Sequence, residues 1–352
     1  MYDRTAAAVN WVEQGRIPDR VVRLGIRHLL RVRRTELGAC DIAASAELTQ
    51  AFLDGLRNAP LALLPDKANE QHYEVPAEFF GAVLGPHRKY SSACWDDGVA
   101  TLAQAEAGAL AATCERAGLV NGQQVLELGC GWGSLTLWIA QHYPDSHITA
   151  LSNSTSQRQY IQAQVIERGL LNVHVLTRDF NAFDTTQRFD RIVSVEMFEH
   201  LRNWPHAFAR VARWLTPHGR FFMHVFAHRG AAYEFVERDA SDWMSKHFFS
   251  GGMMPSDDLA LLCQDDLRVL RRWRWDGTHY ARTAEAWLHN MDAQRTHLAP
   301  MFERTYGADA ARWWVRWRLF FMSVAELFGC DAGQRWWVSH YLFDKRSGAA
   351  PA

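Results

Sequence analysis

Hydrophobic and polar positions follow two different periods in the middle of the chain. Short apolar runs, typical of buried strands, alternate with segments whose apolar positions recur every three to four residues, as in helices. The predicted strands cover 124–128, 147–151, 173–176, 189–195 and 220–226, and the predicted helices cover 100–117, 134–141, 156–168 and 204–215. Pro217 and Gly219 are expected to close the last helix. Strands and helices that alternate through short connections predict a parallel sheet with helices on both faces.

The pattern changes on both sides of this region. Residues 1–88 are predicted to be helical, and residues 230–330 contain aromatic-rich helical stretches around one predicted strand at 267–275. A final strand is predicted at 336–344. We therefore expect an α/β protein in four parts. They are a helical N-terminal extension (1–88), a Rossmann-like core (89–229), a helical lid (230–330), and a last core strand with a tail (331–352).

Composition and charge exclude several classes of protein. The chain has 352 residues, a formal net charge of −1 and 48% hydrophobic residues, which gives no overall attraction to nucleic acid. No stretch approaches 18 uncharged apolar residues, and the N-terminus has no secretory pattern, so no transmembrane segment is expected. The cysteines form no C-x-x-C pair, which predicts no metal site, no disulfide framework and a cytoplasmic location. They are Cys40, Cys94, Cys114, Cys130, Cys263 and Cys330.

A basic amphipathic helix is predicted near the N-terminus. Its arginines recur at spacings of three and four: Arg20, Arg23, Arg27, Arg31 and Arg34. Apolar residues occupy another side: Val22, Ile26, Leu29 and Leu30. The simpler interpretation is a solvated basic face on a helix whose other side packs on the core. The alternative is peripheral contact with an anionic membrane surface. The sequence carries no signal for the oligomeric state.

A glycine-rich turn, Glu127-Leu128-Gly129-Cys130-Gly131-Trp132-Gly133, follows the first predicted strand. Glycine permits positive φ and close approach of the backbone to a ligand. The spacing is G-x-G-x-G, not the G-x-G-x-x-G of dinucleotide-binding turns. The Glu127 carboxylate would repel a pyrophosphate but tolerates a cation. The cationic methionine part of S-adenosylmethionine meets this requirement, so Glu127, Gly129, Gly131 and Gly133 are predicted to bind that cofactor.

Polar residues after the next two strands are candidates for further cofactor contacts. Many nucleotide-binding folds have an acidic residue after the second strand for the ribose hydroxyls, whereas the segment 152–157 here is neutral. Asn153 and Gln157 carry both donors and acceptors and are the candidates for those hydrogen bonds. After the third strand, Asp179-Phe180-Asn181 offers an acceptor for an adenine amine and an aromatic ring to stack on it.

The segment Glu196-Met197-Phe198-Glu199-His200 follows the fourth strand, at the sheet edge where open α/β folds bind ligands. If the chain turns helical here, Glu196, Glu199 and His200 share one face. A carboxylate can hold an ammonium group and raise the basicity of the histidine, which then accepts a proton. The segment thus predicts chemistry on an amine. A charged helix N-terminus would account for Glu196 but not for His200.

Together, these motifs resemble the cyclopropane-fatty-acyl-phospholipid-synthase-like methyltransferases, and especially the plant coclaurine, tetrahydroprotoberberine and pavine N-methyltransferases. The resemblance begins at Tyr90-Ser91-Ser92, includes the motifs above, and continues through segments such as 248–256, 279–283 and 324–329. It implies a class I methyltransferase fold. It implies that Tyr90 and Ser91 reach over the cofactor and that its site is lined by Gly129, Gly131, Ser152, Asn153, Gln157, Asp179, Phe180 and Val195. It also implies that Glu196, Glu199 and His200 surround a substrate amine.

Two classes of methyl acceptor fit this resemblance. The cyclopropane branch modifies unsaturated fatty acyl chains of phospholipids and uses bound bicarbonate as the base. The bicarbonate ligands of that branch match Ser92 (a cysteine in the family), Glu199, His224 and Tyr280, although an interior histidine is an equal interpretation of His224. That branch usually has glycine at position 196. A carboxylate there has little use beside an alkene but a clear use beside an amine.

We therefore expect N-methylation of a small arylalkylamine, in which Glu196 binds the amine, His200 acts as general base and Glu199 orients one or the other. Lipid modification is the alternative. A non-catalytic cofactor-binding protein is a third hypothesis, which the intact glycine turn and the segment 196–200 disfavour. Tryptophans are numerous in the C-terminal part: Trp243, Trp273, Trp275, Trp287, Trp313, Trp314, Trp317, Trp336 and Trp337. Core packing explains most of them, and the others could line a pocket for a ring-bearing amine or an acyl chain.

Overall fold

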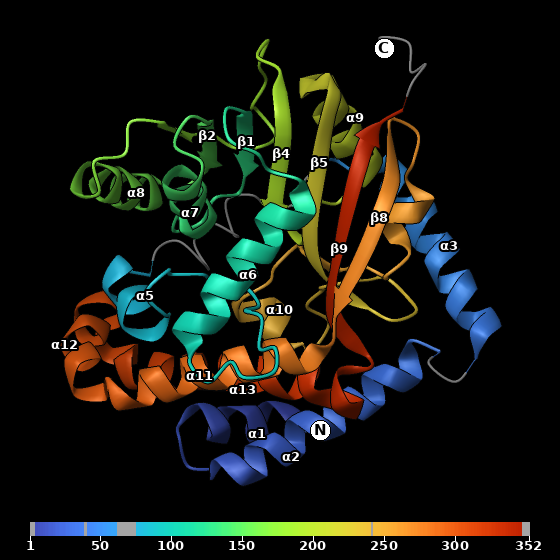
Figure 1. The fold of residues 1–352 in the computed structure, drawn as a ribbon. Helices are drawn as coiled ribbons and strands as arrows, with labels where there is room; N and C mark the ends of the chain where they lie inside the picture. Colours follow the sequence, from blue (N-terminus) through green and yellow to red (C-terminus); the bar gives the residue numbers. More distant parts are fainter. Residues whose placement is uncertain (1–3, 39–40, 62–74, 241, 347–352) are drawn as a thin grey trace.

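A seven-stranded sheet in the order β3-β2-β1-β4-β5-β9-β8 forms the centre of the molecule (Figure 1). The computed structural model describes residues 4–38, 41–61, 75–240 and 242–346. The sheet strands are β1 (Gln124–Leu128), β2 (His147–Ser152), β3 (Val173–Thr177), β4 (Phe189–Val195), β5 (Leu215–His228), β8 (Leu267–Trp275) and β9 (Trp336–Lys345). Strands β1 to β5 are parallel, whereas β9 runs antiparallel to both β5 and β8. The predicted α/β class is confirmed.

Alternate residues of the strands enter separate hydrophobic cores, because successive side chains of a strand point to opposite faces. Val125 and Phe222 pack on the face covered by α6 and α7. Leu126 and Phe221 pack on the other face, with α3 and α9. The longer helices are α1 (Arg4–Glu13), α2 (Asp19–Glu36), α3 (Ile42–Asn58), α6 (Leu102–Ala117), α7 (Ser134–His142), α8 (Thr155–Glu167), α9 (Trp204–Trp214), α11 (Gly277–Ala293), α12 (Arg295–Tyr306) and α13 (Ala310–Gly329).

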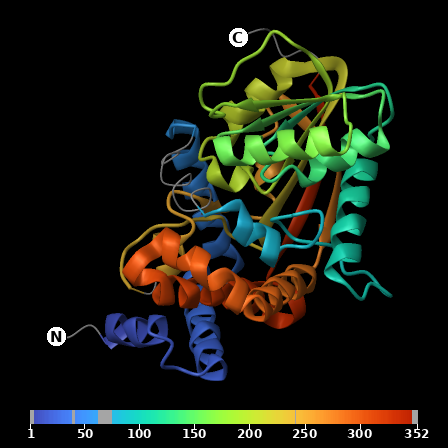
Figure 2. The same cartoon turned by 90° about the vertical axis from the view of Figure 1, so that its left-hand side faces the viewer.

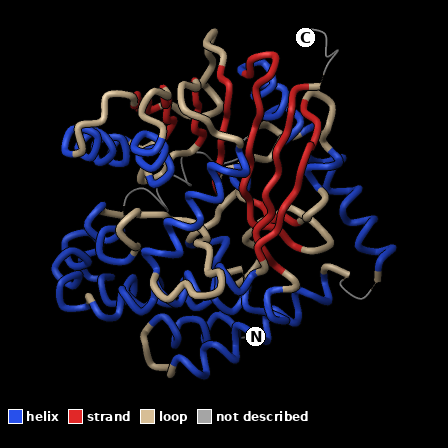
Figure 3. The backbone as a smooth tube through the Cα atoms, in the orientation of Figure 1, coloured by secondary structure: helices blue, strands red, loops and turns tan. Residues whose placement is uncertain are grey.

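A layer of helices lies below the sheet, at the end that carries the carboxyl ends of the parallel strands (Figures 1 and 2). Helices α11 and α13 pack side by side, with α12 and α5 (Ala77–Val83) at one end and α1 and α2 underneath. The short elements α10 (Trp243–His247), β6 (Tyr233–Glu234) and β7 (Met253–Met254) lie between β5 and this layer in the chain. Figure 3 shows how helices dominate this half of the molecule. The segment 230–330 therefore supplies helices of the lower layer as well as the edge strand β8.

The start of β5 differs from the prediction. The helix α9 ends at Trp214 and β5 begins at Leu215, so Pro217 and Gly219 lie within a strand instead of closing a helix. Phe189 pairs with Leu215, and the register then shifts before the next pairs of β4 and β5. This bulge accommodates the additional residues of β5. A Cβ on Gly219 would lie 2.7 Å from the carbonyl oxygen of Phe189, so glycine permits the close approach of the two strands.

Several arginines of α2 form ion pairs with acidic residues of other segments. Arg23 pairs with Glu285 at 2.6 Å and with Glu326 at 3.1 Å, and Arg27 pairs with Glu326 at 2.5 Å. Arg34 pairs with Asp331. The predicted solvated basic face is therefore wrong for Arg23 and Arg34, whereas Arg20, Arg27 and Arg31 are exposed. Apolar side chains are exposed on the same helix: Val21, Leu24, Leu29 and Val32. Among the described residues, no helix combines the length and apolar character that a membrane crossing requires.

Replacement of Glu326 by glutamine is expected to weaken the attachment of α2. Its side chain is only 11% exposed and it binds both Arg23 and Arg27, so the free energy of unfolding should fall by about 1–2 kcal/mol. The matched control is Glu285→Gln, because Glu285 also binds Arg23 but is 47% exposed. We expect the free energy of unfolding of Glu285→Gln to fall by less than about 0.5 kcal/mol. Urea titrations of both variants give the comparison, and equal losses would contradict it.

Candidate active site

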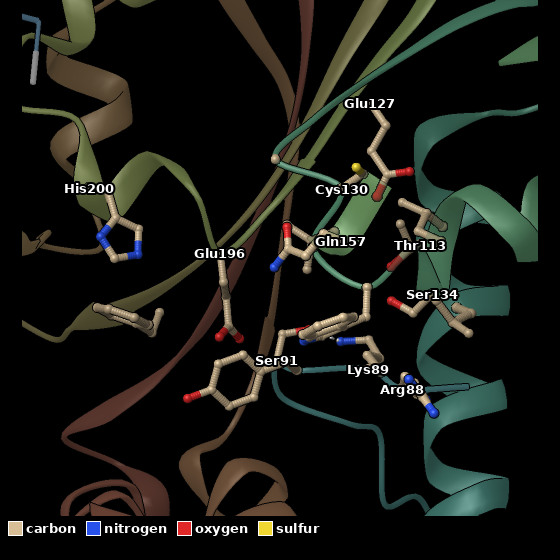
Figure 4. A pocket seen from close by; sticks show the side chains of 18 of the residues that line it. Arg88, Lys89, Ser91, Thr113, Glu127, Cys130, Ser134, Gln157, Glu196 and His200 are labelled. Carbon is tan, nitrogen blue, oxygen red and sulfur yellow. Dashed lines mark hydrogen bonds between the residues drawn. The ribbon is translucent and has the colours of Figure 1, made fainter. Parts of the chain in front are cut away.

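A pocket lies at the carboxyl ends of β1 and β4, above the lower helices (Figure 4). It encloses about 940 Å³, including the space that opens to solvent. Its wall comes from the loop before α6, from α6 itself, from the turns after β1 and β4, and from the lower helices. The lining residues are Arg88, Lys89, Tyr90, Ser91, Leu110, Thr113, Glu127, Gly129, Cys130, Gly131, Trp132, Ser134, Leu135, Gln157, Val195, Glu196, His200, Phe226, Phe249, Tyr280, Trp287 and Phe320.

The glycine turn forms one side of the pocket. Gly129, Gly131 and Gly133 all have positive φ, at 76°, 51° and 76°. A Cβ on Gly129 would lie 2.6 Å from Met197, and one on Gly133 would lie 2.6 Å from Ile161. A Cβ on Gly131 would meet no described atom within 4 Å, and this residue lines the pocket. Gly131 thus leaves space for a ligand, whereas Gly129 and Gly133 also allow neighbouring segments to pack closely.

Glu127 lies at the end of β1, beneath this turn. Its side chain is buried and accepts a hydrogen bond from the Thr136 hydroxyl. Burial raises the pKa of the Glu127 carboxyl to about 8. A cationic ligand in the pocket would stabilise the ionised form, because opposite charges favour ionisation. The position therefore suits the positively charged methionine part of S-adenosylmethionine.

Four buried polar atoms in the pocket wall have no hydrogen-bond partner among the described residues. They are Arg88 Nη1 before α6, Thr113 Oγ1 on α6, Trp132 Nε1 in the glycine turn and Trp287 Nε1 on α11. Native proteins rarely keep buried polar groups unpaired, so a ligand is expected to supply the partners. These atoms and the open space at Gly131 fit a polar cofactor of the size of S-adenosylmethionine.

Two of the candidate cofactor contacts after β2 are hydrogen-bonded to each other. Ser152 Oγ donates to Gln157 Oε1 at 2.7 Å, and Gln157 points into the pocket (Figure 4). Ser152 itself is buried behind it and does not line the pocket, and neither does the partly exposed Asn153. Gln157 is therefore the residue of this group that reaches the ligand space in the structure.

The candidate adenine contacts after β3 lie away from the pocket wall. The Asp179 carboxylate accepts hydrogen bonds from the backbone and side-chain nitrogens of Asn181. Phe180 is buried, and its ring packs against Phe198 and Trp214. None of the three candidate residues lines the pocket. Their contact with adenine stays a prediction.

A segment before α6 is held against the pocket by residues that the motifs did not identify. Glu106, fully buried on α6, accepts backbone hydrogen bonds from Gly85, His87 and Lys89 at 3.0, 2.9 and 3.3 Å. Burial raises the pKa of this carboxyl to about 7. The available signal was that Glu106 falls on the apolar side of a predicted helix, between Ala105 and Ala109.

Lys89 extends this attachment to the residues that line the pocket. Its Nζ donates to Ser91 Oγ at 2.5 Å and to the Ser92 carbonyl oxygen at 2.6 Å. Burial lowers the pKa of the Lys89 ammonium to about 8. Glu106 and Lys89 together fix the path of the chain through Tyr90 and Ser91, both of which line the pocket as the resemblance implies.

The Glu196 carboxylate is bound by donors from three parts of the chain. Its Oε1 accepts from the Ser92 backbone N–H at 2.9 Å and from His224 Nε2 at 3.1 Å, and its Oε2 accepts from the Tyr280 hydroxyl at 2.7 Å. The side chain is 8% exposed, and burial raises the pKa of its carboxyl, with Lys89 acting in the opposite direction. Glu196 also has a φ of 47°, a region that non-glycine residues rarely adopt.

The prediction that Glu196, Glu199 and His200 share one helical face is wrong. The left-handed backbone of Glu196 prevents an α-helix from starting there, and only Phe198–His200 forms a short 3-10 turn. Glu199 instead turns toward β5, where it accepts from the Phe226 N–H at 2.8 Å and does not line the pocket. Burial and the charge of Glu196 raise the pKa of the Glu199 carboxyl well above its ordinary value, which favours its neutral form.

His200 lies across the pocket from the glycine turn (Figure 4). Its ring stacks with that of Phe249 at 6.0 Å between centroids. Burial lowers the pKa of His200 to about 4, while the charge of Glu196 acts in the opposite direction. The imidazole is therefore neutral at pH 7, which is the form that can accept a proton.

Three of the positions that match bicarbonate ligands of the cyclopropane branch converge on one group. Ser92, His224 and Tyr280 all donate to the Glu196 carboxylate, whose geometry and charge are like those of bicarbonate. The fourth is Glu199. It lies close enough to Glu196 for the charge of Glu196 to raise the pKa of the Glu199 carboxyl. The side chain of Glu196 thus lies among three residues that the resemblance matches to bicarbonate ligands of the cyclopropane branch.

Comparison with known proteins gives consistent results. A family model described as mycolic acid cyclopropane synthetase matches residues 65–331. The (S)-coclaurine N-methyltransferase of Thalictrum flavum subsp. glaucum is 35% identical over 342 residues, which cover 95% of this chain and 94% of that protein. The cyclopropane-fatty-acyl-phospholipid synthase of Escherichia coli (strain K12) is 30% identical over 269 residues, which cover 74% and 67% of the two chains.

The similarity extends to three dimensions. A crystal structure of coclaurine N-methyltransferase, bound to N-methylheliamine and SAH, matches this structure with a TM-score of 0.93 and 33% sequence identity. The match covers 96% of this chain and 99% of that chain. Both the sheet and the lower layer of helices are therefore shared with a methyltransferase of known structure.

Proposed function

Because the chain belongs to the mycolic acid cyclopropane synthetase family and is an S-adenosylmethionine-dependent methyltransferase, we propose that it methylates the nitrogen of a small arylalkylamine. One observation carries the choice of acceptor. The Glu196 carboxylate lies at the pocket and takes the place of bicarbonate among Ser92, His224 and Tyr280. A fixed anion at this point attracts an ammonium group and gives no advantage to an alkene.

The walls of the pocket support an acceptor with an aromatic ring. Aromatic side chains surround the space beside Glu196: Tyr90, Phe226, Phe249, Tyr280, Trp287 and Phe320. Ring faces attract cations and pack against flat apolar groups. Of the C-terminal tryptophans, Trp287 lines the pocket, while Trp243, Trp317 and Trp336 are buried in the core.

The proposed mechanism assigns separate tasks to two side chains. The bound cofactor supplies an electrophilic methyl group on a sulfonium. Glu196 binds the substrate ammonium and fixes its nitrogen in line with that methyl group, which lowers the entropic part of the barrier. His200 accepts the proton that the nitrogen must lose before it can attack. His200 is neutral at pH 7, so a ring nitrogen can accept the proton; burial lowers its basicity, and the charge of Glu196 offsets part of this loss.

For the cofactor we propose contacts from the pocket-lining candidates Tyr90, Ser91, Glu127, Gly129, Gly131, Gln157 and Val195. Gly133 is proposed to act through the packing of the turn, and Ser152 through its hydrogen bond to Gln157. We also retain the cytoplasmic location as a proposal, which the free cysteines among the described residues support. Peripheral membrane contact through α2 stays a prediction.

The decisive experiment offers both acceptor classes to the same enzyme. Purified protein is incubated with methyl-labelled S-adenosylmethionine and, in parallel reactions, a panel of arylalkylamines and vesicles of unsaturated phospholipid. We expect label in the amine products and none above background in the lipid. The relative from Escherichia coli, a cyclopropane-fatty-acyl-phospholipid synthase, serves as the positive control for the vesicles. Label in the lipid fraction alone would overturn the proposed acceptor.

A further inference from the structure

A chain of hydrogen bonds connects Glu196 to an arginine at the end of α6. His224 Nε2 lies 3.1 Å from Glu196 Oε1, and His224 Nδ1 lies 3.0 Å from His340 Nε2. The remaining nitrogen of His340, Nδ1, bonds to Arg116 NH1. We propose that Arg116 and His340 are positioning residues that, through His224, hold Glu196 ionised and oriented for the amine. This inference rests on the proposed role of Glu196.

The chemistry of the arginine gives this relay one direction. A guanidinium group only donates hydrogen bonds, so His340 Nδ1 must accept. A neutral imidazole carries its proton on the other nitrogen, so His340 Nε2 donates to His224 Nδ1. By the same rule His224 Nε2 carries a proton and donates to Glu196. Each imidazole therefore has one tautomer available. In that tautomer each ring donates its N–H in the direction of Glu196, which favours negative charge on the Glu196 carboxylate.

The surroundings keep both imidazoles neutral. His224 and His340 are completely buried, and burial lowers the pKa of each well below its ordinary value. They lie directly opposite each other in the antiparallel pairing of β5 and β9. Trp275 on β8 meets both rings edge to face, with centroids 4.4 Å from His340 and 5.8 Å from His224. This packing leaves little room for either ring to rotate and exchange its nitrogens.

Arg116 anchors the relay in the last turn of α6. Its guanidinium lies over the rings of Trp275 at 5.0 Å and Trp273 at 5.6 Å, contacts that favour the cation. Burial lowers the pKa of the Arg116 guanidinium, and the nearby charges of Glu115 and Asp96 act in the opposite direction. The relay therefore carries the influence of a fixed charge along this face of the sheet to the pocket.

The relay explains how a carboxylate can stay charged in a buried site. An ionised group away from water is stable only with hydrogen bonds or opposite charges. Besides His224, the groups that face Glu196 are the cation Lys89, the hydroxyl of Tyr280, the carboxyl of Glu199, whose pKa is raised, and His200. Lys89 donates its hydrogen bonds to Ser91 and Ser92 and not to Glu196. Arg116, acting through His340 and His224, is therefore the second source of positive charge for Glu196.

The test combines spectroscopy with a pH profile. Histidine ¹⁵N spectra of the protein should show His224 with its proton on Nε2, and His340→Phe should allow the other tautomer to appear. In Arg116→Met, the acid limb of kcat/KM for the amine should move up by about one pH unit, because Glu196 loses support for its charge. Arg116→Lys retains the charge and should move it less. His340→Gln retains an N–H donor, so it should retain part of the support for Glu196 that His340→Phe removes.

Controls separate this role from simple destabilisation. Arg191→Met removes another half-buried arginine, one bonded to the Gly118 carbonyl, and should leave the acid limb unchanged. An unmoved acid limb in Arg116→Met, or an unchanged His224 tautomer in His340→Phe, would overturn the relay. If the wild-type protein methylated no amine, the proposed function would fail, and the tautomer of His224 would still test the relay without turnover.

Discussion

Replacement of Glu196 by glycine is expected to reduce kcat/KM for amine methylation by about 10²-fold or more, because the anion that binds the ammonium is lost. Binding of S-adenosylhomocysteine, measured by calorimetry, should change little. The fold should survive, since a φ of 47° strains glutamate but not glycine. The variant also leaves Ser92 N–H, His224 and Tyr280 as donors around an empty space. Added bicarbonate or formate should therefore restore part of the activity.

Glu196→Gln is the matched control. Its amide retains the volume and the strained backbone but carries no charge, so activity should fall without rescue by small anions. Equal losses of methylation and cofactor binding in Glu196→Gly would mean that Glu196 contacts the cofactor or supports the fold. Full activity of Glu196→Gly on amines would remove the basis for the proposed acceptor.

Replacement of Glu106 by alanine is expected to weaken cofactor binding through the segment that Glu106 holds. Three buried backbone N–H groups, those of Gly85, His87 and Lys89, would lose their acceptor. The free energy of unfolding should fall by about 3–5 kcal/mol, at a cost of about 1–3 kcal/mol for each unpaired donor with partial relaxation. Because the same segment continues into Tyr90 and Ser91, calorimetry should show at least about tenfold weaker binding of S-adenosylhomocysteine.

Two variants of the same helix make this result specific. Glu106→Gln retains one carbonyl oxygen as acceptor and should lose less in both measurements. Glu115→Ala removes an exposed glutamate from α6 and should change neither. If Glu106→Ala lost stability but bound the cofactor normally, the segment 85–92 would have no part in the cofactor site.

The elements of the core could be predicted from periodicity because their physics is local. The strands β1, β4 and β8 have the predicted bounds, because each combines apolar residues at short spacing with turn residues at its ends. The start of β5 was missed because Pro217 and Gly219 normally end helices. In this protein a bulge opposite Phe189 accommodates them, and a bulge depends on the partner strand, which periodicity along one segment does not reveal.

The site was predicted in its parts but not in its arrangement. The glycine turn and Glu196 were found because their residue types follow strands at the binding edge of the sheet. The positive φ of Glu196 could not be inferred from a residue type that rarely adopts it, and it redirected Glu199 and His200 away from a common face. The partners of Glu196 come from positions 92, 224 and 280, so only the fold brings them together.

The position of β9 has a consequence for the synthesis of the protein. This strand follows all the others in the chain, yet it pairs between β5 and β8, and β8 has no other partner in the sheet. While the ribosome is still adding residues 336–345, the long edge of β5 and both edges of β8 are unpaired. Such edges are prone to aggregation, so the nascent chain is expected to depend on chaperones until these residues emerge.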